Sequence, residues 1–166
     1  MKNRIFQKYL WEFVYWWIDG SITTFAIVAW SVWANLDPSI ILILGFANLI
    51  ADGFAMSVWA YLSADSKDWK VTKKEQLYKA GITFFSFILL GFIPLIIYIL
   101  QYFWIEFSNA FFYASALTLI GFVVIWYIKS YVAKISYMKS IWETLLLWIM
   151  AAGVAYYIWD FLEKII

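Results

Sequence analysis

Long apolar segments separated by short polar breaks dominate the chain. Crossing the hydrocarbon core of a bilayer takes about 20 consecutive, mostly apolar residues in a helix. Stretches of this kind lie at residues 9–34, 39–63, 78–101, 109–128 and 141–161. The pattern therefore predicts an all-α, polytopic membrane protein with five transmembrane helices, forming a single transmembrane domain over residues 1–166.

Local chemistry marks two of the breaks. Asn35-Leu36-Asp37-Pro38 predicts a tight reversal between the first two helices, because Pro38 suits the first position of a helix. Within the third stretch, Pro94 lacks a backbone N–H group and predicts a kink. The charged connector at 64–77 is too short to hold a core of its own, so no soluble domain is expected.

The composition agrees with lipid as part of the solvent. Of 166 residues, 66% are hydrophobic and 14% are charged, against about 45–50% and about 25% in a typical soluble domain. Cysteine and histidine are both absent, which excludes disulfides, thiolate metal sites and the commonest zinc ligand and general base. The net charge of +1 gives no reason to expect a nucleic-acid partner.

The basic residues are distributed unevenly between the two sides of the predicted bilayer. All 12 lysines and arginines except Lys164 fall before the first stretch or near the breaks after the second and fourth. Cytosolic segments of membrane proteins carry such an excess of Lys and Arg. We therefore predict a cytosolic N-terminus, in a multi-pass protein of the cell membrane or, in a eukaryote, of a vacuole-type membrane.

Apart from Asp160 at the end of the last stretch, four carboxylates interrupt the predicted helices: Glu12, Asp19, Asp52 and Glu143. An ionisable group inside a span costs roughly 2.5–3.5 kcal/mol on insertion scales and is functional by default. Counting along each helix places Asp19 and Asp52 near the middle of the bilayer, and the two glutamates nearer the cytosolic face.

Spacing along the first two helices predicts a metal site. Glu12 and Asp19 are seven residues apart and share a helix face, as do Asn48, Asp52 and Met56, which are spaced by four. If these faces meet, carboxylates, an amide oxygen and a thioether converge. Oxygen ligands suit Mg²⁺, Mn²⁺ and Fe²⁺, and the sulfur favours a transition metal. Buried carboxylates can also exchange a cation for protons.

Several members of this set have a purely structural alternative. Met56 can fill a gap in the core, and Asn48 can hydrogen-bond between helices. Glu12 can reach the interface, and Glu143 can either cap the fifth helix or act as a ligand at the cytosolic entry. The two aspartates lack such alternatives, because a carboxylate in mid-membrane without a role is uncommon.

Four segments resemble the vacuolar iron transporter family. Residues 18–29 (IDGSITTFAIVA) are similar to its first-helix signature, and 45–56 (GFANLIADGFAM), followed by Tyr61-Leu62-Ser63, to its second. Residues 91–95 (GFIPL) and 151–156 (AAGVAY) resemble its third and fifth helices. The similarity runs in order over nearly the whole chain.

The resemblance implies a homodimer of five-helix protomers that moves Fe²⁺ or Mn²⁺ out of the cytosol in exchange for protons. The metal is then a substrate, no resident cofactor is expected, and the protein is not an enzyme. The family's first-helix Asp falls on Asp19, its second-helix Met on Met56, and an acidic residue two turns before the Asp on Glu12. Asn48 stands where some members carry a glutamate.

Two departures from the family pattern keep other functions open. The connector after the second helix lacks the long, glutamate-rich insertion of iron-transporting members, and Trp30, Trp33 and Trp59 stand where glycine is usual. Indoles at these positions predict widened or plugged helix contacts. The alternative is a non-transporting membrane scaffold or accessory subunit. An intramembrane aspartyl hydrolase that uses Asp19 and Asp52 is disfavoured, because the expected Gly-x-Gly-Asp pattern is absent.

Overall fold

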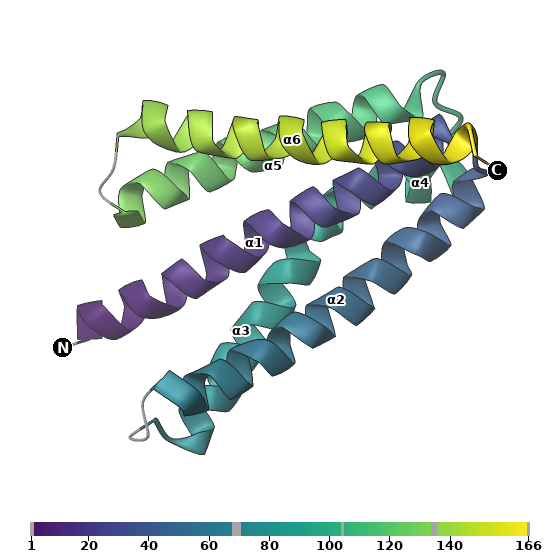
Figure 1. Cartoon of the computed structure of the whole chain (residues 1–166). Coiled ribbons are helices and arrows are strands. Elements are labelled where there is room, and N and C mark those ends of the chain that lie inside the picture. Colours follow the sequence, from purple (N-terminus) through teal and green to yellow (C-terminus); the bar gives the residue numbers. More distant parts are fainter. Residues whose placement is uncertain (1, 68–70, 104, 134–135, 166) are drawn as a thin grey trace.

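The computed structural model describes residues 2–67, 71–103, 105–133 and 136–165 (Figure 1). Over these residues the chain forms six α-helices and no β-strand, which confirms the all-α prediction. The helices are α1 (Lys2–Trp33), α2 (Pro38–Lys67), α3 (Lys73–Gly91), α4 (Ile93–Phe103), α5 (Ala110–Ala133) and α6 (Tyr137–Glu163).

Within the described ranges, three segments are long and apolar enough to cross a membrane: Pro38–Ala64, Ala110–Ser130 and Ile141–Glu163. The pair α3 and α4 adds a fourth candidate if the two helices form one bent span. Helix α1, which carries Asp19 in its middle, is not among them. Five spans and a cytosolic N-terminus therefore stay predictions.

Helix α1 is the central element of the bundle. It packs against each of the other five described helices, and its polar residues Ser21, Thr24 and Ser31 are at most 1% exposed. Helix α6 lies along α1 and α5, and none of the side chains that the structure describes in its candidate span is buried. The N-terminal end of α1 and the C-terminus lie at opposite ends of the molecule (Figure 1).

The turn between α1 and α2 follows the predicted chemistry. Asn35 adopts a φ of 53°, the left-handed conformation in which many helices end. The Asp37 carboxylate accepts hydrogen bonds from the backbone N–H and the hydroxyl of Ser39, at 2.8 and 2.6 Å. Helix α2 begins at Pro38, so the sequence located this turn correctly.

The third predicted span is broken between α3 and α4, which are bent by 53°. Pro94 lies just inside α4 and has no N–H group to donate to the carbonyl of Leu90, four residues earlier. The hydroxyl of Ser21, on α1, donates to that carbonyl over 3.3 Å. The bend is therefore braced from α1 at the place where the helix loses its own hydrogen bond.

Two glycines allow α1 and α3 to approach closely next to this bend. A Cβ added to Gly20 would lie 2.9 Å from the carbonyl carbon of Phe87 and closer still to its oxygen. A Cβ on Gly91 would lie 2.7 Å from the carbonyl oxygen of Gly20 and 2.9 Å from the Thr24 hydroxyl. Because Asp19 directly precedes Gly20, this junction fixes the position of Asp19.

Candidate metal site

Asp19 and Met56 line one cavity of about 650 Å³ between α1, α2, α5 and α6. Asp19 comes from the middle of α1 and Met56 from α2, and both side chains are partly buried. The structure therefore brings together a carboxylate and a thioether that the helical spacing had placed on two separate faces.

Asp52 lies on α2 one helical turn before Met56 and is also partly buried. It is not among the residues that line the Asp19 cavity. Its carboxylate is nevertheless close enough to repel that of Asp19. A divalent cation between α1 and α2 would relieve this repulsion, because it would neutralise both carboxylates.

Asn48 lies outside the cavity lining and points to a different neighbour. Its amide nitrogen donates to the Thr24 hydroxyl over 3.5 Å, which links α2 to α1. Thr24 is fully buried, so this contact lies within the helix interface. The geometry therefore matches the interhelical hydrogen bond that the sequence left open as an alternative to metal binding.

The two glutamates of the predicted set have different outcomes. The side chain of Glu12 lies outside the described part of the structure. Glu143, on α6, accepts a 2.8 Å ion pair from Lys129 on α5. Lys129 itself lines the cavity with Asp19 and Met56.

Lys129 is the cavity residue that sequence reasoning missed. The predicted fourth span ends at Ile128, so the sequence assigns Lys129 to the cytosolic charges. In the structure, α5 continues to Ala133. A cation at the end of one span and a carboxylate near the start of the next could have indicated the pair. Opposite charges inside a membrane are expected to find each other.

Aromatic side chains form part of the cavity wall. The rings of Trp16 on α1 and Trp59 on α2 meet edge to face, with centroids 5.6 Å apart, and both residues line the cavity. Trp59 remains 54% exposed. Of the other two tryptophans that replace glycine, Trp33 packs edge to face against Tyr156 at 5.3 Å, and Trp30 lines the next cavity along α1.

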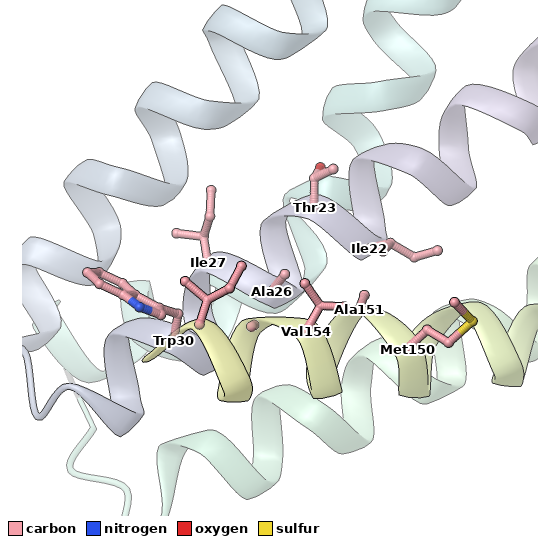
Figure 2. A pocket seen from close by; sticks show the side chains of 10 residues that line it. Ile22, Thr23, Ala26, Ile27, Trp30, Met150, Ala151 and Val154 are labelled. Atoms are coloured by element: carbon pink, nitrogen blue, oxygen red, sulfur yellow. The ribbon is translucent and has the colours of Figure 1, made fainter. Parts of the chain in front are cut away.

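Three cavities follow one another along the contact between α1 and α6. The Asp19 cavity shares Ile22 and Ala151 with an apolar groove of about 480 Å³ (Figure 2). That groove shares Trp30 with a third cavity of about 300 Å³, which reaches Asn35 and Glu163 at the far ends of the two helices. Three separate cavities, each sharing lining residues with the next, thus lie between Asp19 and the end of the molecule that carries the C-terminus.

The donor set in one chain is small. Among the described side chains, no three carboxylate, histidine or cysteine groups gather into a cluster that could hold a metal ion. Asp19, Asp52 and Met56 supply at most two carboxylates and one thioether. A divalent ion of the Fe²⁺ or Mn²⁺ type accepts further oxygen ligands, so one protomer leaves room for water or for groups from another chain.

Comparison with known proteins agrees with the motifs. The model of the VIT family matches residues 10–76 and 67–159. A protein of Toxoplasma gondii (strain ATCC 50861 / VEG) named "Vacuolar iron transporter" is 42% identical over 60 residues. This match covers 36% of the present chain and 20% of the relative's length. No solved structure matches the chain.

Proposed function

Since the chain belongs to the VIT family, as its helix motifs indicated, we propose that it transports a divalent transition metal, Fe²⁺ or Mn²⁺. The family and the several apolar helices make it an integral, multi-pass membrane protein. The metal is the substrate of this proposal, and no catalytic chemistry is assigned.

The observation that carries the proposal is the shared cavity of Asp19 and Met56. A carboxylate supplies the negative charge that a divalent cation requires in a low-dielectric setting. A thioether adds a soft ligand, which favours Fe²⁺ or Mn²⁺ over Mg²⁺. The neighbouring Asp52 carboxylate adds a second negative charge.

The direction of transport and its coupling extend the proposal. We place the N-terminus in the cytosol, in agreement with the lysine and arginine distribution, and count α1 and the bent α3–α4 pair as spans. An odd number of spans would put the two termini on opposite sides of the membrane. This agrees with their positions at opposite ends of the molecule (Figure 1). Export of the metal in exchange for protons would use Asp19 and Asp52 as the groups that bind either cation.

A homodimer is the assembly that best completes the metal site. The described side chains of one protomer offer too few ligands for a full coordination shell, and a twofold axis beside α1 and α2 would supply a second copy of Asp19 and Met56. Native mass spectrometry from nanodiscs tests this part of the proposal. A monomer in both nanodiscs and mild detergent would contradict the proposed homodimer.

The row of cavities along α1 gives the proposed pathway. Its middle section, between Ile22 and Trp30, is apolar apart from Thr23, so a hydrated cation does not cross this conformation. Thr23 already donates its hydroxyl to the Asp19 carbonyl over 3.0 Å. Transport therefore requires α6 to move away from α1, and the exposure of the described side chains in the α6 span is compatible with such a movement.

The decisive experiment replaces Asp19 with Asn in protein reconstituted into liposomes. Asp19→Asn keeps the shape of the side chain and removes the charge, so Fe²⁺ or Mn²⁺ uptake should fall to background and tenfold more metal should not restore it. Glu106→Gln makes the same charge change in the exposed segment between α4 and α5 and should transport normally. Uptake by Asp19→Asn near the wild-type rate would refute the transport mechanism.

A membrane scaffold is the second candidate, and the tryptophans favour it. Trp16 and Trp59 line the wall of the Asp19 cavity, and Trp30 lies between the groove and the far cavity and lines both. If these indoles plug the pathway, the wild-type protein binds metal without moving it. Metal flux in liposomes separates the two functions.

A further inference from the structure

A lysine shares the cavity in which the proposed substrate binds. Lys129 lies inside the candidate span Ala110–Ser130 of α5, and its side chain is 16% exposed. An ammonium group within a membrane is costly unless it is paired. Because Lys129 lines the same cavity as Asp19 and Met56, a positive charge faces the place where a divalent cation would sit.

Lys129 is paired with Glu143, which lies outside the lining of that cavity. The Lys129 ammonium contacts the Glu143 carboxylate at 2.8 Å, and Glu143 is 44% exposed. The ion pair joins α5 to α6, and α6 also contributes Leu147 and Ala151 to the cavity lining. Glu143 therefore holds the ammonium on the side of the cavity that α6 forms.

The flexible side chain of Lys129 gives the ammonium a second acceptor. Lysine carries its charge on a four-carbon stem with several rotatable bonds, and Asp19 is the carboxylate that lines the same cavity. In the structure the ammonium is paired with Glu143, and a rotation of the side chain would turn it toward Asp19 across the shared cavity. The ammonium can lie close to only one of these two carboxylates at a time.

We infer that Lys129 is a built-in competitor of the metal at Asp19, and that Glu143 holds it back. Without metal, the ammonium can turn to Asp19 and neutralise it. The structure shows the other arrangement, in which the ammonium is on Glu143 at 2.8 Å and Asp19 is left to a divalent cation. The inference rests on the proposed metal site and explains how a carboxylate site inside a membrane releases its cation.

The two partners should affect metal affinity in opposite directions. Lys129→Met removes the competing charge and keeps the length of the side chain, so the Kd for Mn²⁺ should fall by about tenfold or more, because a like charge at close range in a low-dielectric cavity strongly opposes a cation. Glu143→Gln releases the ammonium toward Asp19, so the Kd should rise.

The double variant distinguishes a guiding role of Glu143 from direct ligation. If Glu143 acts through Lys129, then Lys129→Met/Glu143→Gln binds Mn²⁺ as tightly as Lys129→Met alone. If Glu143 is itself a ligand, the double variant binds more weakly than Lys129→Met, and the inference is overturned. The double variant removes both charges of the Lys129–Glu143 ion pair together, so it is the variant to use if Lys129→Met does not fold.

The experiment is a titration of the full chain in nanodiscs with Mn²⁺, followed by calorimetry. Lys164→Met is the matched control, because Lys164 forms a comparable 2.7 Å ion pair with Asp160 at the other end of α6; its Kd should equal that of the wild type. Wild-type protein that binds Mn²⁺ no better than Asp19→Asn would refute the metal site itself. Wild-type binding that depends on Asp19, with an unchanged or raised Kd in Lys129→Met, would overturn only the role of Lys129.

Discussion

Replacing Gly20 with alanine should separate the two helices that hold Asp19 in place. The added Cβ would lie 2.9 Å from the carbonyl carbon of Phe87 and closer to its oxygen, whereas ordinary van der Waals contact begins at 3.4 Å. Both partners are backbone atoms of α3, so rotation of a side chain cannot relieve the clash. The helices must move apart by about half an ångström or more, and Asp19 moves with α1.

The cost can be estimated against a control on the same helix pair. Overpacking a tight interior costs typically about 1–3 kcal/mol. A Cβ on Gly81, also on α3, meets nothing within 4 Å, so Gly81→Ala should gain up to about 1 kcal/mol from helix propensity. Gly20→Ala receives the same gain, because Gly20 is also a helical residue. Gly20→Ala should therefore be less stable than Gly81→Ala by about 1–3 kcal/mol.

Thermal unfolding in detergent, followed by tryptophan fluorescence, measures this difference. At roughly 2–4 °C per kcal/mol for a chain of this size, Gly20→Ala should melt several degrees below Gly81→Ala. Its Mn²⁺ affinity should fall as well, because Asp19 is displaced from Met56. Equal melting temperatures for the two variants would show that α1 and α3 do not pack at Gly20 as described.

Three further predictions concern single side chains. Ser21→Ala should lower the free energy of unfolding by about 1 kcal/mol, because the Leu90 carbonyl loses its donor from α1. Ser115→Ala, whose hydroxyl bonds within its own helix, is the control, and equal losses would contradict the bracing role. Met56→Leu should weaken Fe²⁺ or Mn²⁺ binding far more than Mg²⁺ binding in parallel titrations, and equal weakening would make Met56 a packing residue. Hydrogen bonds from the Ser39 hydroxyl and N–H hold the pKa of Asp37 below its usual 3.8, so the start of α2 should be protected from hydrogen exchange above that pH and lose protection as the pH falls through the lowered pKa. Protection that does not change between pH 5 and pH 2 would contradict this coupling.

Features set by local chemistry were predictable from the sequence. The start of α2 at Pro38 depends on neighbouring residues, as does the left-handed Asn35 before it. The convergence of Asp19 and Met56 was predictable only on the assumption that two helix faces meet. Spacing fixes which residues share a face and leaves open which faces pack together.

Features set by the neighbouring helix were not predictable. Asn48 shares a face with Met56, yet it bonds to Thr24 because α1 presents a hydroxyl there. Lys129 lines the cavity because α5 runs on past the apolar stretch and α6 brings Glu143 beside it. Both depend on the three-dimensional partner of a residue, which one sequence does not reveal.

The hydropathy of α1 follows from its place in the bundle. A helix that carries Asp19 together with Ser21, Thr23 and Thr24 is poorly suited to face lipid, and α1 is instead covered by every other described helix. The helices on the two sides of α1 pack against it differently. On the α3 side, the two helices approach so closely at Gly20 and Gly91 that neither position has room for a Cβ atom. On the α6 side, a row of cavities lies along the contact between the helices, and no side chain that the structure describes in the α6 span is buried. Asp19 thus lies between a closely packed side and a side lined by cavities, so the proposed opening of the metal site would require α6 to move while the junction that positions Asp19 stays intact.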